Sequence, residues 1–289
     1  MLQINDIEKK LVEAIRKAET ELPADVVTVL KEAYKREENG SVARSQFDAI
    51  LKNIEVAKAE GLPLCQDTGT QTFFVEVGTD FKDIKLLKPA IINAVRRATD
   101  EVPLRPNTVE PFTGSNPNDN TGRFIPHITW ELVEGQEVII NILPKGGGGE
   151  NMSALGMLKP AQGIEGAKQF IINHVIQSGG KPCPPTVLGI GIGGGADLSL
   201  KLAKKSLLRK LGERHSDAEI AKLEEELIKA INSTGIGPMG LGGKTTVLDV
   251  HIEWAHRHPA SFPVGIVTQC WADRRAQLII HSDGSMEVC

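Results

Sequence analysis

The feature of this sequence that most restricts its fold is a change in apolar spacing near position 60. Before that point apolar residues recur every three or four positions, as Ile7, Leu11 and Ile15 do, which is the period of an amphipathic helix. Pro23 and Gly40 interrupt the pattern and divide it into three helical stretches. The sequence therefore predicts a helical region over residues 1–60.

After residue 63 short apolar runs of strand length alternate with longer helical runs. The strand-like runs are rich in Val, Ile and Phe and are bounded by glycine, proline or polar residues. We expect strands at Thr72–Val77, Phe124–Leu132, Val138–Leu143, Val187–Ile192, Val247–Glu253, Val264–Thr268 and Ala276–His281. We expect helices at Leu86–Ala98, Ala161–Gln177, Asp197–Lys210 and Ser216–Ile231, the last opened by a capping box from Ser216 to Glu219.

Residues 103–123 interrupt this pattern with a dense run of proline, asparagine, threonine and glycine. A long irregular segment inside a compact domain is usually functional. The fold class that follows is α+β, with the helical region 1–60 followed by a mixed β-sheet flanked by helices over residues 61–289. We expect the whole chain, 1–289, to form a single domain.

Charge and hydropathy exclude several classes of partner. The net charge is only −4 and no block of Lys or Arg stands out, which argues against nucleic acid and anionic membranes. The charged N-terminal stretch lacks the apolar core of a signal peptide, and no apolar run of about 18 residues could span a bilayer. We therefore expect a cytoplasmic protein whose four cysteines form no structural disulfides.

Cys65, Cys183 and Cys270 each lie in a turn-prone segment beside polar residues. They could be three unrelated core thiols, since free cysteine is among the most buried residue types. They could also bind one metal site, although their spacing is too wide for a zinc knuckle or a C-x-x-C pair. Three thiolates could hold an iron–sulfur cluster whose fourth iron stays open as a Lewis acid. Cys289 suits a fourth ligand less well, because chain ends usually fray.

Other motifs leave alternative sites open. Lys145–Asn151 contains four successive glycines but lacks the Lys-Ser/Thr end of a P-loop. Gly189–Gly195 fits the dinucleotide pattern, although no second strand ending in an acid follows it; its N–H groups would equally suit a carboxylate substrate. A zinc site formed by His251, His256 and His258 is conceivable, but His251 alternates along a predicted strand.

Five blocks of the chain, taken together and in order, resemble the N-terminal catalytic part of class I, iron–sulfur-dependent fumarate hydratases. They also resemble the related α subunits of tartrate dehydratase, although the overall likeness favours fumarate as the substrate. The likeness covers nearly the whole chain from residue 60 onward. The blocks are Leu64–Thr70, Leu104–Asn107, Pro144–Asn151, Cys183–Gly194 and His256–Val264 continuing to Cys270.

This resemblance implies a [4Fe–4S] cluster held by Cys65, Cys183 and Cys270. The open iron would bind the carboxylate and hydroxyl of the substrate and act as a Lewis acid. The implied activity is the reversible hydration of fumarate to malate, a hydro-lyase reaction of the tricarboxylic acid cycle.

The resemblance also implies roles for five further residues. Gln66 and Arg105 would hold substrate carboxylate oxygens, which suits the two-pronged guanidinium of arginine. Asp67 would lie by the leaving hydroxyl as a proton donor or orienting group, and a backbone N–H near Gly148 would touch the substrate. His258 would either contact the substrate directly or lie behind a residue that does. Asp67 could instead form an Asx turn with Thr68 or Gly69, and His258 could cap the turn before Pro259.

One departure from the family pattern concerns the missing half of the site. Full-length members continue into a second domain that supplies a catalytic threonine base and further substrate-binding residues. This sequence stops at Cys289 without such a region, so it resembles the α subunit of a split enzyme whose β subunit is a separate chain. We expect a heterotetramer of two α and two β chains, or a homodimer of this chain, acting on a small dicarboxylate.

Two alternatives to fumarate hydration remain open. The first is the same chemistry on another diacid, as in the α subunit of L-tartrate dehydratase. The second is an iron–sulfur protein that binds its cluster without catalysis. Gln66, Asp67 and Arg105 argue against the second, because an electron carrier has no need of carboxylate-binding groups.

Overall fold

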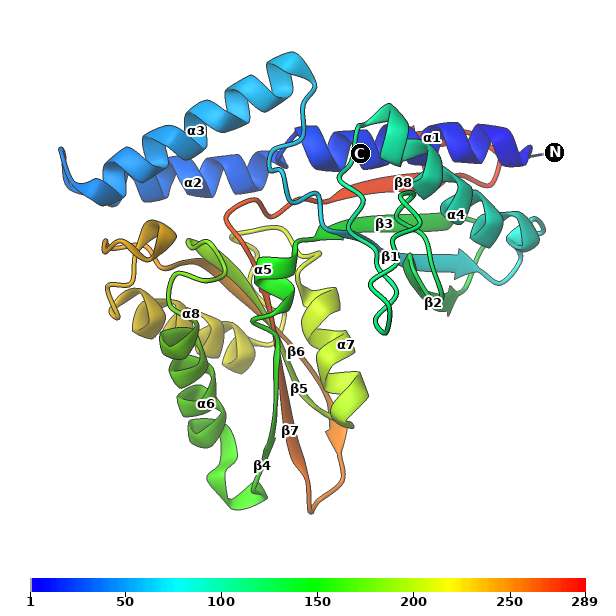
Figure 1. Cartoon of the computed structure of the whole chain (residues 1–289). Helices are drawn as coiled ribbons and strands as arrows, with labels where there is room; N and C mark the ends of the chain where they lie inside the picture. The colour runs from blue at the N-terminus through cyan, green and yellow to red at the C-terminus, as the bar shows by residue number, and fades with distance from the viewer. Residues whose placement is uncertain (1) are drawn as a thin grey trace. The chain divides into compact units, whose positions relative to one another are not determined.

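The computed structural model describes residues 2–289, which form two compact units (Figure 1). Unit 1 consists of the chain up to Pro23 together with Asn53–Gly147 and Arg274–Cys289, and unit 2 consists of Ala24–Lys52 and Gly148–Asp273. Each unit contains one mixed sheet with helices packed against it, which confirms the α+β class. The single domain over 1–289 stays a prediction, and the helical first 60 residues are shared between the two units.

Three helices occupy the N-terminal region, as the apolar spacing predicted. They are α1 (Ile4–Thr20), α2 (Ala24–Arg36) and α3 (Val42–Glu60). Ile7, Leu11 and Ile15 on α1 are completely buried, because their spacing places them on one face of the helix.

Unit 1 is built on a five-stranded sheet in the order β2-β1-β3-β8-β9. Its strands are β1 (Thr70–Gly78), β2 (His127–Val133), β3 (Val138–Lys145), β8 (Ala276–Ile280) and β9 (Met286–Val288). Strand β1 runs parallel to β2 and antiparallel to β3. Helix α1 and helix α4 (Ile84–Glu101) share one apolar core with this sheet. Gln71, at the start of β1, donates a hydrogen bond to Glu19 near the end of α1.

Unit 2 is built on a four-stranded sheet in the order β4-β7-β5-β6. The strands are β4 (Ala154–Leu158), β5 (Thr186–Gly194), β6 (Val247–Arg257) and β7 (Phe262–Gln269). Helices α6 (Gly163–Ser178) and α8 (Ala218–Asn232) cover one face of this sheet, and α7 (Ala196–Ser206) covers the other (Figure 1). The remaining short elements are α5 (Gly147–Glu150) and two single turns of 3₁₀ helix, Pro160–Gln162 and Pro238–Gly240.

Strand β5 explains one of the glycine clusters. Because strand side chains alternate between faces, Leu188, Ile190 and Ile192 point into the core with α6 and α8. The glycines between them face α7: a Cβ on Gly191 would lie 1.9 Å from the carbonyl oxygen of Ser199. These glycines let the backbone of α7 approach the sheet, so close packing accounts for them without a dinucleotide.

The structure differs from the sequence expectations at several boundaries. The strand expected from Phe124 begins at His127, because Phe124 has a positive φ of 62° and continues the irregular segment. Helix α8 is capped by Asp217 rather than Ser216, since the Asp217 carboxylate accepts the N–H groups of Glu219 and Ile220. The short strands β4 and β9 were not predicted. Within residues 2–289 no helix is both long and apolar enough to cross a membrane.

Candidate functional site

The Cys65 turn lies in unit 1, between α3 and β1, and its thiol is half-buried. The N–H of Leu64 donates to the carbonyl oxygen of Glu19 at 2.8 Å, which joins the turn to the end of α1. The N–H of Asp67 points at the Cys65 sulfur with an N···Sγ distance of 3.4 Å. This contact fixes the position of the sulfur relative to the backbone of the turn.

The Asp67 carboxylate accepts hydrogen bonds from three directions. Its Oδ1 accepts from the N–H of Gly69 at 3.0 Å and from Asn107 Nδ2 at 3.4 Å, and its Oδ2 accepts from the N–H of Gly147 at 2.8 Å. The Asx turn considered as an alternative in the sequence is therefore present. Both oxygens already act as acceptors, which favours an orienting role over proton donation.

A polar network fixes Arg105 beside this turn. The backbone N–H of Arg105 donates to Thr68 Oγ1 at 3.1 Å, and its carbonyl accepts from Asn120 Nδ2 at 3.1 Å. Asn107 Nδ2 donates to the carbonyl of Gly69 at 3.2 Å. The backbone of Arg105 is thus held in place while its side chain stays exposed, as does that of Gln66.

The first glycine of the Lys145–Asn151 cluster lies against the same turn. Gly69 has a φ of 70°, and a Cβ there would lie 2.5 Å from the carbonyl carbon of Lys145. Glycine is therefore required at position 69 both for the backbone conformation and for the close approach. Together with the bond from Gly147 to Asp67, this contact joins the Cys65 turn to the end of β3.

Beneath the turn lies a buried ion pair that the sequence expectations missed. Arg274 Nη1 donates to Glu19 Oε2 at 2.6 Å, and Arg274 Nη2 donates to the carbonyl of Asp67 at 3.0 Å. Gln71 Nε2 donates to the other Glu19 oxygen at 2.8 Å. Burial raises the pKa of Glu19 above its ordinary value, and the charge of Arg274 opposes that rise. One signal was available: Glu19 falls four residues after Ile15, on the buried face of α1.

Cys183 and Cys270 lie on neighbouring backbone segments of unit 2. The N–H of Trp271 donates to the carbonyl of Cys183 at 3.2 Å. Cys183 has a φ of 55° between two prolines, a strained conformation that folds retain mainly at functional positions. The Cys183 side chain is exposed and that of Cys270 is half-buried.

Two further predicted site residues also belong to unit 2. Gly148 is exposed at the second residue of α5. His258 is exposed in the connection between β6 and β7, where its Nδ1 accepts from the N–H of Ala260 at 3.1 Å. The turn cap considered as an alternative for His258 is therefore present, and a substrate contact would have to come from the rest of the ring.

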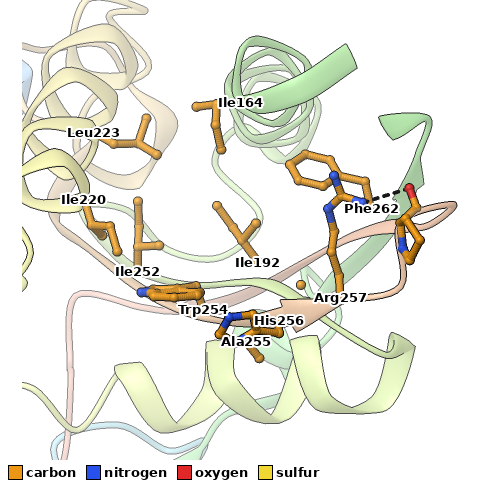
Figure 2. Close-up of a pocket in the computed structure, with 12 residues that line it drawn as sticks. Ile164, Ile192, Ile220, Leu223, Ile252, Trp254, Ala255, His256, Arg257 and Phe262 are labelled. Atoms are coloured by element: carbon orange, nitrogen blue, oxygen red, sulfur yellow. Dashed lines mark hydrogen bonds between the residues drawn. The ribbon is translucent and has the colours of Figure 1, made fainter. Parts of the chain in front are cut away.

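One hollow in unit 2 is apolar (Figure 2). It has a volume of about 560 Å³ and is lined by side chains such as Ile192, Leu223 and Trp254. The guanidinium of Arg257 at its rim lies over the Phe262 ring and donates to the carbonyl of His258 at 3.1 Å. A dicarboxylate would need charged partners to replace its lost hydration, so this hollow does not fit the predicted substrate.

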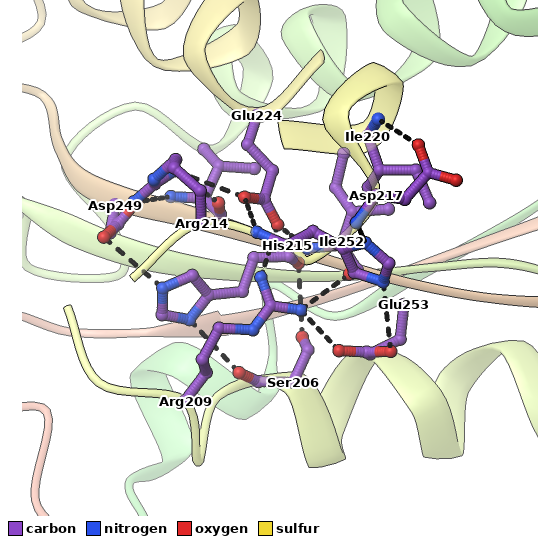
Figure 3. A network of polar contacts seen from close by, with 12 residues as sticks. Ser206, Arg209, Arg214, His215, Asp217, Ile220, Glu224, Asp249, Ile252 and Glu253 are labelled. Carbon is purple, nitrogen blue, oxygen red and sulfur yellow. Dashed lines mark hydrogen bonds and ion pairs between the residues drawn. The ribbon is translucent and has the colours of Figure 1, made fainter. Parts of the chain in front are cut away.

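Unit 2 also contains a buried network of charges (Figure 3). Arg209 Nη1 donates to Glu224 at 2.6 Å, and Arg209 Nη2 donates to the carbonyl of Ile252 at 2.9 Å. Burial alone would raise the pKa of Asp249, but hydrogen bonds from His251 and Arg214 hold that pKa below its ordinary value. His251 is completely buried and engaged with Asp249 and Ser206. These contacts account for His251 without zinc.

The donor set suits an iron–sulfur cluster, although no complete metal site is formed. Among residues 2–289, no group of three or more His, Cys, Asp or Glu side chains is arranged to hold a metal ion. Cys65 belongs to unit 1, whereas Cys183 and Cys270 belong to unit 2. Thiolates are the ligands that such clusters use, and the N–H directed at the Cys65 sulfur fits that use. By contrast, the pKa of the Cys289 thiol is raised, first by burial and then by Glu287, which makes it a poorer ligand.

Comparison with known proteins adds independent information. A family model for fumarate hydratase (fumerase) matches residues 8–279. A Methanocaldococcus jannaschii protein provisionally named L(+)-tartrate dehydratase subunit alpha is 50% identical over 289 residues, covering 99% of this chain and 100% of that protein. The L(+)-tartrate dehydratase subunit alpha of Escherichia coli O157:H7 is 37% identical over 269 residues, covering 93% of this chain and 88% of that protein. Its counterpart in strain K12 is 36% identical over the same share of both chains.

Proposed function

This chain belongs to the fumarate hydratase (fumerase) family of hydro-lyases, and from that premise we propose that it is the α subunit of an iron–sulfur fumarate hydratase. The enzyme would interconvert fumarate and malate with a [4Fe–4S] cluster bound by Cys65, Cys183 and Cys270. The observation that supports this best is the fixed polar network that surrounds Cys65, Asp67 and the backbone of Arg105.

The chain's own residues can bind and orient a dicarboxylate. Arg105 extends an exposed guanidinium from a backbone that Thr68 and Asn120 hold in place, and that guanidinium can pair with a carboxylate. Gln66 is exposed next to Cys65 and can donate an amide N–H to the same group. Asp67 would orient the hydroxyl, since hydrogen bonds already fix its carboxylate. A backbone N–H near Gly148, which is an exposed residue, and the ring of His258 complete the proposed set.

The cluster, when bound, would supply an open iron as the Lewis acid for the departing hydroxyl. Cys65, Cys183 and Cys270 are the residues proposed to hold it. The backbone beside Cys65 is held by the hydrogen bond from the N–H of Leu64 to Glu19, and that of Cys183 by bonds with Gly180 and Trp271, as a ligand that must keep one geometry requires.

A separate β subunit would supply the rest of the site. The relatives in M. jannaschii and E. coli are both named as alpha subunits. The residues proposed here include no base for the proton on carbon, and general base catalysis typically contributes about 10²–10⁴-fold. We therefore propose an active site shared between two kinds of chain, in a heterotetramer or a related assembly.

L(+)-tartrate is the second candidate substrate. It is favoured by the names of the relatives at 36–50% identity, whereas the family description favours fumarate. Both substrates are four-carbon dicarboxylates that lose or gain water, so Arg105 and Gln66 would serve either one.

The test is a hydration assay on the chain after anaerobic cluster reconstitution, with and without its β chain. We expect near-zero loss of fumarate absorbance for the chain alone and rapid loss after the β chain is added. Dehydration of L(+)-tartrate by the same complex, compared as kcat/KM, decides between the two substrates. Rapid turnover without a partner would contradict the shared site, and a bound cluster with neither activity would indicate a non-catalytic iron–sulfur protein.

A further inference from the structure

The ion pair between Glu19 and Arg274 is the most deeply buried charged contact beside the Cys65 turn. Neither side chain exposes more than 2% of its surface. Arg274 forms two directed contacts, one to the Glu19 carboxylate and one to the carbonyl of Asp67. The pair joins segments that are 255 residues apart in the sequence.

A purely stabilising role does not explain why charges occupy this position. Burying an ion pair loses hydration that the attraction often fails to repay, so apolar residues of similar size are frequently as stable. Glu19 also lies in the last turn of α1, where the helix dipole disfavours a negative charge. Burial and the helix dipole therefore both disfavour a charged carboxylate at Glu19.

The geometry of the contacts is specific to the Cys65 turn. Glu19 contributes its carboxylate to Arg274 and Gln71, and its backbone carbonyl to the N–H of Leu64. Arg274 then holds the carbonyl of Asp67, two residues beyond Cys65. The turn is thus held at both ends, immediately before and shortly after the thiol.

We infer that Glu19 and Arg274 are positioning residues that fix the backbone presenting the Cys65 thiol and the Asp67 carboxylate. This inference rests on the proposed function for the use of Cys65 as a ligand. Two of the contacts of the pair are to the main chain, at the Leu64 N–H before the thiol and at the Asp67 carbonyl after it, and it is through these that the pair fixes the turn. An arginine is required because its planar fork can reach a carboxylate and a carbonyl together, whereas a lysine offers one flexible charge.

The test compares Arg274→Lys with Arg209→Lys in the full chain. Arg209 is a matched control, because it also bridges a buried carboxylate and a backbone carbonyl, but in unit 2. Amide hydrogen exchange of peptides covering residues 62–72 should rise about tenfold in Arg274→Lys, since exchange follows the free energy of local opening. The same peptides should be unchanged in Arg209→Lys, in which exchange should rise at residues 248–254 instead.

A second readout follows the thiols directly. Mass spectrometry after iodoacetamide treatment of cluster-free protein should show faster alkylation of Cys65 in Arg274→Lys, by about fivefold if the turn opens locally. Alkylation of Cys289, which is exposed in the same unit, should not change. Glu19→Gln serves as a second variant, because it keeps the shape of the side chain but removes its charge.

The outcomes separate this inference from the proposed function. Unchanged exchange at residues 62–72 would overturn the positioning role even if the wild-type chain loads iron. Conversely, if exchange at residues 62–72 rises in Arg274→Lys but the wild-type chain never loads iron, the positioning role is supported and the proposed cofactor is contradicted. A rise spread over all of unit 1, or failure of both variants to fold, would show a merely structural pair and would also overturn the inference.

Discussion

The two units hold their cysteines by different means. In unit 1 side chains fix the Cys65 turn, through Asp67, Thr68, Asn107 and Arg274. In unit 2 main-chain hydrogen bonds fix the loop at Cys183: its N–H donates to Gly180, and its carbonyl accepts from Trp271. A loop that presents a cysteine can therefore be fixed by polar side chains or by main-chain hydrogen bonds. The first kind should be sensitive to removal of a side chain, and the second to substitutions that disturb the backbone.

The largest effect should come from the cysteines themselves, whichever unit holds them. If they form one ligand set, Cys65→Ser, Cys183→Ser and Cys270→Ser should each reduce loading from about four irons per chain to near zero. Iron and sulfide analysis after anaerobic reconstitution measures this. Cys289→Ser is the control and should load normally. Full loading in any of the first three variants would contradict the ligand set, because the replaced cysteine would then not be a ligand.

The next effect tests the dependence of unit 2 on backbone geometry. Gly191→Ala would place a Cβ 1.9 Å from the carbonyl oxygen of Ser199 on α7. Backbone cannot move aside cheaply, so we expect a loss of about 3 kcal/mol in the free energy of unfolding. Urea unfolding of the full chain measures it.

A matched glycine in unit 1 controls for glycine replacement itself. The nearest atom to a Cβ on Gly122 is a methyl carbon of Thr108 at 3.4 Å, which is an ordinary contact distance. Gly122→Ala should therefore change the free energy of unfolding by less than about 1 kcal/mol. Equal losses at Gly191 and Gly122 would show that close packing of α7 is not the reason for the glycines of β5.

The smallest expected effect tests how far unit 1 depends on side-chain hydrogen bonds. Asn107→Ala removes the bonds to Asp67 Oδ1 and to the carbonyl of Gly69, and we expect a loss of about 1–2 kcal/mol in the free energy of unfolding. Asn173→Ala on the exposed face of α6 is the control, expected to stay within about 0.5 kcal/mol. Similar values for both variants would mean that the network around the Cys65 turn contributes little.

Much of the fold could be predicted because helix and strand periods are local properties. Ile7, Leu11 and Ile15 share a helix face in any context, and they are buried as expected. The strand expected at Thr72–Val77 lies within β1 for the same kind of reason. Failures occurred where the local signal was short or absent, as in the three-residue strand β9, or where a positive φ at Phe124 delayed the start of β2.

The candidate site could be predicted only in part. Cys65 stood out because of its turn-prone, polar surroundings, whereas Asp67 and Arg105 were assigned through the family resemblance, and these roles stay predictions. Glu19 and Arg274 did not stand out, because one follows an apolar helix stripe and the other lies in a run of charges after Cys270. Nothing in the spacing of these two residues shows that they meet.

By itself the sequence determined the α+β class and the family, since these follow from periodicity and ordered motifs. The residues expected to bind a cluster and a dicarboxylate came from the family resemblance and stay a prediction. The tertiary structure alone decided which polar groups contact one another. It engaged the Asp67 carboxylate in three hydrogen bonds, used the glycines of β5 for the approach of α7, and joined Arg274 to Glu19 across 255 residues. The physical reason is that hydrogen bonds and close packing depend on distances between segments, which chain folding sets and local pattern does not encode.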